Sequence, residues 1–567
     1  MPVRSQDTDV FDYVIVGAGA AGCIVANRLS ADGKNTVCVL EAGPRDHNIH
    51  LHIPGGFIKA VTNPRYAWQF KTEPGEGTAG RPITVQQGKT LGGSTAINGF
   101  NYNRGQPGDF DTWAQQGNRG WGYADVLPYF KRTERRIGEA DDRYRGSEGA
   151  LPITDCDWRH PLCDAFIETA QRLGLPRNAD YNGVSQKGVG YFQRWIQNGW
   201  RMSTARTFLR PAAKNKNLEV RTNAQATAVL FEDKRASGIR YAQGPGHPSR
   251  EVRARREVIL CSGAANTPKL LQISGVGPAH LLGELGIPVV HDVPGVGANL
   301  RDHYMVRIVV RVKGVETIND MAHGPRLWRE IARWTVGLPS ILAVSPSVAF
   351  GFANASDLTL PPDIQLNFTP GSFTKSVTGL LDNFPGMTLG FYQLRPESTG
   401  HVHARSADPF DDPIIQPNYL IDAEDKRVVL AGIKLVRRLL AGPDFQPNYE
   451  REESPGASVA EDADLLDFAR NSGNTSYHLM GTCRMGPKTD PSAVVDDELR
   501  LYGLQGLRVV DASIMPTMPS ANTCASTFMI AEKASDLILA RPPLAAQVFD
   551  AVADNLNPPH RSSRLNA

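Results

Sequence analysis

Cysteine pairs, long apolar runs and an excess of one charge are all missing from this chain of 567 residues. Its seven cysteines are scattered and form no CxxC pair, which argues against a disulfide framework and against a zinc site. No eighteen apolar residues run together, so we expect no membrane span. Lys and Arg number 61 against 59 Asp and Glu, which leaves no charge excess for binding nucleic acid.

The rest of the composition is that of a folded, water-soluble protein with a small-molecule partner. Hydrophobic residues make up 41% and charged residues 21%, and the length suffices for two large domains or one elaborated domain. The N-terminus lacks the apolar stretch and cleavage site of a signal peptide, so we expect a cytoplasmic protein and leave peripheral membrane association open. No metal site is expected, because His47, His50 and His52 lack a carboxylate or cysteine partner.

The N-terminal residues follow the order strand, glycine turn, helix, strand. Residues 11–16 are apolar and β-prone, residues 17–22 are rich in glycine, residues 23–29 have helical spacing, and residues 36–40 form a second strand-like run. This order predicts the opening of a βαβ unit. Residues 44–125 show little periodicity and predict extended loops with short elements.

Near residue 305 the sequence changes to segments in which apolar and polar residues alternate. This pattern predicts a second domain that contains an antiparallel sheet, and the domain ends near residue 470. Within it, residues 305–312 and 364–368 alternate like strands, and residues 425–440 have helical spacing. Arg132, Arg135 and Arg136 are expected on a solvated helix face. The elements expected elsewhere are helices at 161–173, 204–214 and 527–539, a strand pair within 219–241, and strands at 258–262 and 507–510.

Gly17, Gly19 and Gly22 form a GxGxxG motif directly after the first predicted strand. Without side chains there, backbone N–H groups and the helix dipole can meet a pyrophosphate. Glu41 ends the second strand, 19 residues past Gly22, where it can accept hydrogen bonds from a ribose diol. The motif predicts an adenine dinucleotide, disfavours NADP, and by itself leaves FAD and NAD open.

Two further segments favour FAD over NAD. The glycine-dense loop GKTLGGSTAIN at 88–98 is longer than a plain NAD site requires, and GAANTPKLLQISGVG at 263–277 precedes NLRDH at 299–303. The two longer segments closely resemble the signature patterns of the glucose-methanol-choline (GMC) oxidoreductases, with Thr95 where serine is usual. The resemblance extends over about residues 11–540 and includes the segments RGQPGDFDTW, LRPESTGHV and VVDASIMP. It is especially close to the choline dehydrogenase and primary-alcohol dehydrogenase branch of the family.

The resemblance implies an α/β fold with two domains. The first is a GMC-type, Rossmann-like FAD-binding domain, and the second is a substrate-binding domain built on an antiparallel sheet flanked by helices. The implied FAD domain is discontinuous and comprises residues 8–155, 200–304 and 475–541. Residues 156–199 and 305–474 make up the implied substrate domain, and residues 542–567 are a C-terminal tail.

FAD is expected to bind without a covalent bond. Some members of the family tether it through a histidine at the position of Ile97, and an alkyl side chain cannot form that bond. Asp511 is similar to the acidic residue that binds flavin ribityl or phosphate-side groups in the family, although a turn cap is the alternative interpretation. The residues expected to contact FAD are Gly17, Gly19, Ala20, Gly22, Glu41, Ala42, Gly92, Gly93, Thr95, Asn98, Gly99, Val229, Asp511, Ala512, Asn522 and Thr523.

Oxidation of an alcohol by hydride transfer also requires a base for the hydroxyl proton, and histidine is the natural one. His478 alone would ordinarily be interpreted as a structural histidine, but its segment matches the family's YHPxGTxRMG, with Leu479 for the common proline. The resemblance implies that His478 is the base and that Asn522, at a position taken by His or Asn, donates to the substrate oxygen. For Asn522 a helix N-cap is the alternative. His303 in NLRDH is expected to support the fold through Asp302.

The sequence therefore predicts FAD-dependent oxidation of a primary alcohol to an aldehyde, with hydride transfer to flavin N5 and O2 or a quinone- or dye-type acceptor taking the electrons. Choline oxidation by a dehydrogenase or oxidase is the alternative within the class, although no acidic residue in 305–470 stands out as a partner for a trimethylammonium group. A flavin-containing lyase of the hydroxynitrile type and a non-enzymatic flavoprotein are the alternatives from other classes.

Overall fold

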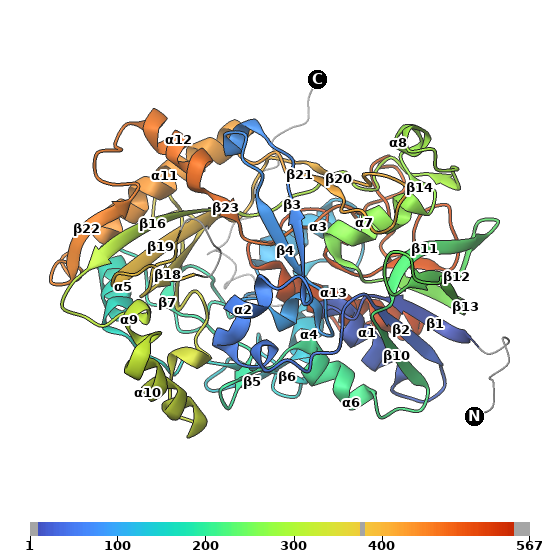
Figure 1. Cartoon of the computed structure of the whole chain (residues 1–567), viewed down its shortest axis with the longest axis horizontal. Coiled ribbons are helices and arrows are strands. Elements are labelled where there is room, and N and C mark those ends of the chain that lie inside the picture. The colour runs from blue at the N-terminus through green and yellow to red at the C-terminus, as the bar shows by residue number, and fades with distance from the viewer. Residues whose placement is uncertain (1–8, 375–379, 549–567) are drawn as a thin grey trace.

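Two sheets of seven strands each organise the computed structural model, which describes residues 9–374 and 380–548 (Figure 1). In the first sheet the main strand order is β10-β2-β1-β13-β12-β11, and β24 pairs with β13. The pairs among β10, β2, β1, β13 and β24 are parallel, and β12 and β11 continue the sheet antiparallel. The bounds of these strands are β1 Val10–Val16, β2 Val37–Glu41, β10 Leu218–Thr222, β11 Gln225–Glu232, β12 Arg235–Ala242, β13 Arg250–Leu260 and β24 Leu507–Val509.

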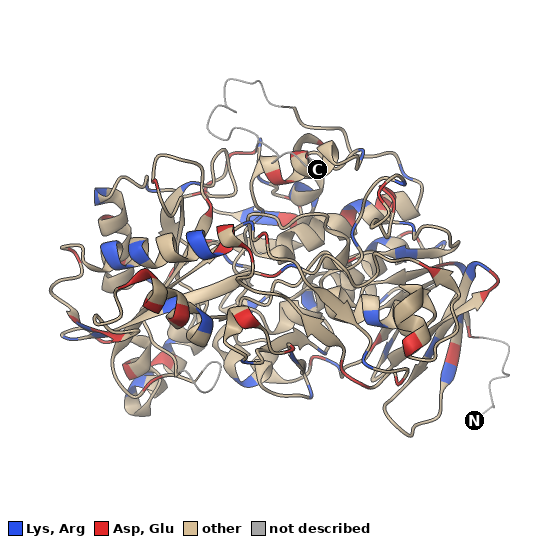
Figure 2. Cartoon of the chain, turned by 90° about the horizontal axis from the view of Figure 1, so that it is seen from above, with Lys and Arg blue, Asp and Glu red and all other residues tan. Residues whose placement is uncertain are grey.

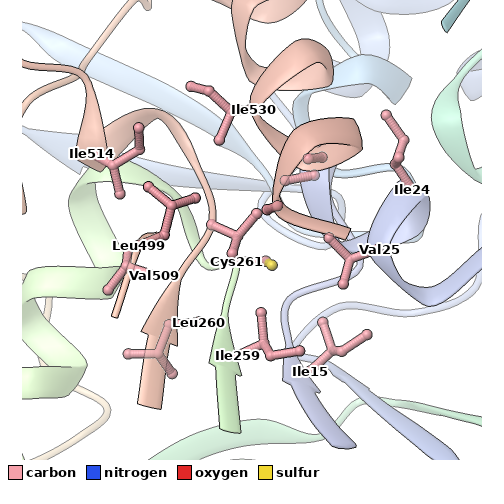
Figure 3. Close-up of a cluster of buried hydrophobic side chains, with 14 of the residues drawn as sticks. Ile15, Ile24, Val25, Ile259, Leu260, Cys261, Leu499, Val509, Ile514 and Ile530 are labelled. Carbon is pink, nitrogen blue, oxygen red and sulfur yellow. The ribbon is translucent and has the colours of Figure 1, made fainter. Parts of the chain in front are cut away.

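The first sheet joins the two ends of the sequence in one core. Helices α1 (Ala20–Ser30) and α13 (Thr523–Ile538) pack against each other. Figure 3 shows Ile15 of β1, Ile24 of α1, Ile259 of β13 and Ile530 of α13 in a single apolar cluster. Because β1, β2, β13 and β24 run parallel, the segments that follow them leave the sheet at the same edge, where ligands bind in open α/β sheets.

The second sheet is antiparallel in every pair, as the sequence predicts, with the main order β22-β16-β19-β18-β17-β7 and with β23 paired to β16. Strand β16 alternates buried and half-buried residues along its length, and its buried residues pack into the core beneath helices α5 (Pro161–Arg172) and α11 (Ala423–Leu440). The other strands are β7 Gly188–Tyr191, β16 Tyr304–Val312, β17 Ala349–Ala353, β18 Ile364–Thr369, β19 Gly386–Gln393, β22 Tyr449–Ser454 and β23 Asn474–Thr475.

The prediction of a solvated helix face for the KRTERR segment is wrong. Helix α4 (Tyr123–Thr133) ends inside the segment, and Arg136 lies on the short strand β5 (Glu134–Ile137). The Arg136 side chain is buried and forms an ion pair of 2.8 Å with Asp155. The sequence does not reveal this, because a run of charges has no local signature of a partner 19 residues away.

The remaining segments differ from the predictions mainly in detail. The predicted helix at 204–214 opens with a π-helical turn over Ala205–Leu209 and ends with α6 at Arg210–Ala212. Residues 44–125 contain a strand hairpin, several short helices and the first residues of α4 besides loops. The further elements are α2 Phe57–Val61, β3 Ala67–Lys71, β4 Thr84–Gly88, α3 Pro107–Gln115, β6 Leu151–Thr154, β8 Ile196–Gln197, β9 Trp200–Arg201, α7 Gly263–Ile273, β14 Val276–Gly277, α8 Ala279–Glu284, β15 His291–Asp292, α9 Ile318–Met321, α10 Gly324–Thr335, β20 His401–His403, β21 Ile414–Gln416 and α12 Asp462–Ser472.

The surface carries both charge signs. Figure 2 shows basic and acidic residues interspersed along the molecule. Among the described residues no helix is long and apolar enough to cross a membrane. The predicted tail is described only to residue 548, where the Gln547 N–H donates to Ala124 O of α4, and residues 549–567 lie outside the described part of the chain. The predicted domain limits stay predictions.

Candidate active site

One cavity, of about 690 Å³, is lined by residues of both sheets. At one end lie the glycine turn after β1 and the end of β2, and at the other lie residues of β16, β18 and β19. Gly22, Gly92, Thr95 and Val229 do not line it. The predicted site residues that do line it are Gly17, Gly19, Ala20, Glu41, Ala42, Gly93, Asn98, Gly99, His478, Asp511, Ala512, Asn522 and Thr523.

The glycine turn makes room for a ligand at the start of α1. A Cβ on Gly22 would lie 1.8 Å from Gly17 O, so the close approach of helix and turn requires glycine. A Cβ on Gly19, in contrast, would find no neighbouring atom closer than 3.9 Å, and this residue faces the cavity. Gly19 is the N-cap of α1 and supplies no side-chain cap, which leaves the first N–H groups of the helix for an anionic ligand.

The glycine-dense loop packs directly on this turn. The Gly92 N–H donates to Ala18 O at 2.7 Å, and a Cβ on Gly93 would lie 2.6 Å from the Gly19 Cα. Thr95 is fully buried, and its hydroxyl donates to Gly92 O at 2.6 Å. Gly92 and Thr95 therefore shape the loop from behind the cavity wall, while Gly93 lies at its surface.

Val229 lies on β11 outside the cavity lining. Its backbone N–H donates to the Ser274 hydroxyl at 2.8 Å and is not available to a ligand in this arrangement. Ala224 and Ala226, near the start of the same strand, line the cavity instead. Contact between Val229 and the cofactor stays a prediction.

Glu41 ends β2 inside the nucleotide end of the cavity. One carboxylate oxygen accepts from the Ala18 N–H and the other from the Gly43 N–H, each at 2.9 Å. Burial raises the pKa of Glu41 to about 7, against the effect of these two backbone N–H groups. Each carboxylate oxygen can accept a second hydrogen bond, so Glu41 keeps acceptor capacity toward a ribose while it joins two turns of the backbone.

Asp511 is bonded to the protein on both oxygens. One oxygen accepts from the Ser513 N–H as a turn cap, and the other accepts from the Gly263 N–H and the Thr267 hydroxyl of α7. The carboxyl group thus fastens the segment after β24 to the start of α7, in agreement with the cap interpretation. Asp511 also lines the cavity, so contact with a cofactor stays a prediction.

The two predicted catalytic residues meet in the cavity. Asn522 Nδ2 lies 2.9 Å from His478 Nε2, although 44 residues separate them in the sequence. Asn522 occupies the N-cap position of α13, yet its side chain makes no capping hydrogen bond. The His478 backbone is fixed from the other side, because its N–H donates to Asp302 at 2.7 Å. The structure therefore gives Asn522 a side-chain partner in the site rather than a helix cap.

Hydrogen bonding defines which nitrogen of neutral His478 carries the lone pair. His303 Nε2 lies 2.9 Å from Leu394 O, and a carbonyl only accepts, so this nitrogen carries a hydrogen. Burial lowers the pKa of His303 to about 4, so its ring is neutral and its Nδ1 is an acceptor. That Nδ1 lies 2.9 Å from His478 Nδ1, which must therefore carry a hydrogen. The lone pair of neutral His478 is left on Nε2, which faces Asn522.

His478 is neutral at ordinary working pH. Burial, and next the neighbouring His303, hold the pKa of His478 well below its usual range. Burial also raises the pKa of Asp302 to about 6, in competition with hydrogen bonds from Thr475, Tyr419 and the His478 N–H. A neutral imidazole with its lone pair in the cavity can accept a proton from a bound hydroxyl.

His303 is a site residue that the sequence did not identify. We expected it to act through Asp302, but its own ring contacts His478 and stacks on Tyr392 at a centroid distance of 4.4 Å. Asp302 instead holds the His478 backbone. Since 175 residues separate the two histidines, no spacing rule in the sequence connects them.

The residues around the cavity fit FAD. The nucleotide end of the cavity is formed by Gly19, which has no side chain, by the uncapped start of α1 and by the carboxylate of Glu41. The free N–H groups of the helix start can bind the pyrophosphate, and Glu41 can bind the ribose. At the other end, Asn522 Oδ1 and Ser476 Oγ are buried without a hydrogen-bond partner among the described residues, and both residues line the cavity. Buried polar atoms of this kind call for a bound partner.

Comparison with known proteins agrees with this site. Residues 11–305 and 396–531 match the N-terminal and C-terminal models of the GMC oxidoreductases, and the chain belongs to this family. Members of the family bind FAD, and this chain is an oxidoreductase of the mixed α/β GMC fold.

Three similar proteins cover nearly the whole chain. An alcohol dehydrogenase [acceptor] from Pseudomonas putida is 39% identical over 95% of this chain and 97% of its own length. An oxygen-dependent choline dehydrogenase from Cronobacter sakazakii is 40% identical over 94% and 96%. The crystal structure of pyridoxine 4-oxidase from Mesorbium loti superposes with a TM-score of 0.83 at 31% identity, over 92% of this chain and 98% of that one.

Replacing Glu41 by alanine is expected to weaken retention of FAD about ten-fold or more, because charge-assisted hydrogen bonds to the ribose are lost. The measurement is the FAD content per protein after extensive dialysis. The matched control is Glu219→Ala, because Glu219 is an exposed glutamate on the neighbouring strand β10. This variant should keep its FAD. Equal FAD content in Glu41→Ala and the control would refute the role of Glu41.

Proposed function

We propose that this protein oxidises a primary alcohol to an aldehyde, with His478 as the general base and Asn522 as the group that holds the substrate oxygen. The observation that carries the proposal is the 2.9 Å contact between His478 Nε2 and Asn522 Nδ2 at the wall of the cavity, together with the neutral state of His478. A base and an oxygen-binding donor are the two groups that alcohol oxidation requires of the protein.

His478 and Asn522 have different roles: His478 accepts the hydroxyl proton, and Asn522 binds the substrate oxygen. His478 Nε2 takes the hydroxyl proton, and His478 Nδ1–H keeps its hydrogen bond to His303 throughout, so the ring does not turn. His478 Nε2 has a single lone pair, so the hydrogen bond from Asn522 Nδ2 gives way when the substrate hydroxyl binds, and Asn522 Nδ2 then donates to the substrate oxygen. FAD, when bound, supplies the acceptor for the hydride at N5, and the electrons then pass to O2 or to a quinone- or dye-type acceptor. The alcohol thereby loses one proton and one hydride.

The cofactor would be held by the glycine turn, the loop at 88–98, Glu41 and the start of α7. Choline oxidation remains the alternative within the class, and the relative from Cronobacter sakazakii supports it by name. A hydroxynitrile-type lyase would use the same fold without net oxidation.

An anaerobic substrate test separates these functions. The purified holoenzyme is mixed with a panel of primary alcohols and with choline in the absence of O2, and flavin absorbance is followed together with aldehyde formation. Bleaching by a primary alcohol with an equal amount of aldehyde supports the proposal. Bleaching by choline alone selects the choline alternative, and no bleaching by any alcohol rejects alcohol oxidation and favours the lyase.

Acid precipitation is expected to release the flavin, because Ile97 lines the cavity with an alkyl side chain that offers no atom for a covalent bond. The protein is precipitated with trichloroacetic acid, and absorbance is measured in pellet and supernatant. A colourless pellet and a yellow supernatant are expected. A yellow pellet after washing would contradict non-covalent binding.

A further inference from the structure

Strand β16 brings one arginine into the cavity. Its residues alternate between the apolar core and the opposite face, and Met305, Arg307 and Val309 of that face line the cavity. Arg311 follows on the same face but does not line the cavity. Arg307 is therefore the cation that β16 presents to the space that receives the substrate.

Arg307 has no counter-ion within residues 9–374 and 380–548. Among the described residues, no carboxylate lies within ion-pair distance of the Arg307 guanidinium, and no guanidinium nitrogen donates a hydrogen bond to a protein acceptor. Arg311, in contrast, pairs with Glu453 at 3.4 Å. Arg81 also lines the cavity, but it donates to the backbone carbonyls of Arg470 and Gly473.

The isolation of this charge is costly. Burial lowers the pKa of Arg307, and the Tyr477 phenol is the group that acts against this effect. A guanidinium stays protonated in proteins, and a neutral phenol does not balance its charge. Arg307 is half-buried at the cavity wall, and a charge taken partly out of water is ordinarily paired, so this one calls for an anion from the ligand.

The position of Arg307 relative to the base is set by the sheet. Met305 pairs with Tyr392 of β19, and the Tyr392 ring lies 5.6 Å from the His478 ring between centroids. Arg307 is two residues further along β16, roughly 7 Å beyond that pair. Its neighbour across the sheet is Gly390, where a Cβ would lie 3.1 Å from the Arg307 Cγ, so the absence of a side chain leaves room for the arginine stem.

We propose that Arg307 binds a carboxylate on the substrate, and that the substrate is a primary alcohol with a carboxylate group at its other end. This inference rests on the proposed function and adds the substrate class to it. The hydroxyl lies at His478 and Asn522, and the carboxylate lies some bonds away at the guanidinium, which suits the planar, two-pronged geometry of an arginine–carboxylate pair.

The same charge opposes choline. A trimethylammonium group needs aromatic faces and a carboxylate. No acidic residue from 305–470 is among the described residues that line the cavity, while Arg307 supplies a like charge. Electrostatics in this half of the cavity therefore favours an anionic alcohol over a cationic one.

The test compares an ω-hydroxyalkanoate with the neutral ω-hydroxyalkanamide of the same length. We expect the wild-type holoenzyme to have the higher kcat/KM for the carboxylate. Arg307→Gln should lower kcat/KM for the carboxylate about 10- to 100-fold, because a charge-assisted hydrogen bond contributes a factor of this size. The same variant should keep kcat/KM for the amide within about three-fold of the wild-type value. Arg311→Gln is the matched control on the same strand face and should change neither substrate.

A binding measurement keeps the proposal independent of turnover. A simple alkanoate without a hydroxyl is titrated into the holoenzyme, and flavin absorbance reports binding. Saturable binding that weakens with added salt and is lost in Arg307→Gln supports the carboxylate site, even if no alcohol were oxidised. No binding to the wild type, or equal loss of activity on carboxylate and amide in Arg307→Gln, would overturn it.

Discussion

His478→Ala is expected to slow anaerobic reduction of the flavin by alcohol about 10²- to 10⁴-fold, the contribution of a positioned general base. FAD binding should be unchanged, because the nucleotide end of the cavity is built from the glycine turn and Glu41 and does not involve the imidazole. The rate is measured by stopped-flow absorbance under saturating alcohol. Asn522→Ala should cost less, since it leaves the base in place.

The pH profile provides a second test of the same residue. The pKa of His478 is lowered well below 6.5, and only the neutral ring accepts the proton. The wild-type reduction rate should therefore be level near pH 7 and should fall only on the acid side of 6.5. A near-normal rate in His478→Ala with full FAD content would show that His478 is not the base.

His303→Leu is expected to lower the reduction rate about 10- to 100-fold without loss of FAD. It removes the acceptor of the His478 Nδ1–H, and leaving a buried donor unpaired costs about 1–3 kcal/mol. The ring of His478 is then free to place its lone pair on either nitrogen. His303→Gln supplies a carbonyl oxygen as a substitute acceptor and should recover most of the rate.

The acid limb of the profile distinguishes a positioning role from simple loss of structure. His303 lowers the pKa of His478, so its replacement by leucine should raise that pKa and move the fall in rate to higher pH. An unshifted acid limb in His303→Leu, or no recovery in His303→Gln, would count against the hydrogen-bond chain from Leu394 to His478.

The nucleotide end of the site could be predicted from local sequence motifs. The GxGxxG turn, the following helix and Glu41 are contiguous, and each depends on short-range rules of backbone sterics and strand geometry. The spacing therefore predicted both the βαβ opening and the cavity-lining positions of Gly19 and Glu41. Resemblance to the family supplied His478 and Asn522, which neither periodicity nor spacing would have distinguished from a structural histidine and a helix cap.

The sequence by itself thus determined the fold class and the dinucleotide turn, and it predicted His478 and Asn522 as the catalytic pair. Only the tertiary structure decided that Asn522 bonds His478 instead of capping α13 and that His303 directs the lone pair of His478 to Nε2. It also decided that Arg307 stands in the cavity without a counter-ion in the part of the chain that the structure describes. Each of these facts depends on contacts between segments far apart in the chain. Such contacts follow from sheet register and packing, and neither hydrophobic periodicity nor a local motif encodes which distant partner a polar side chain will meet.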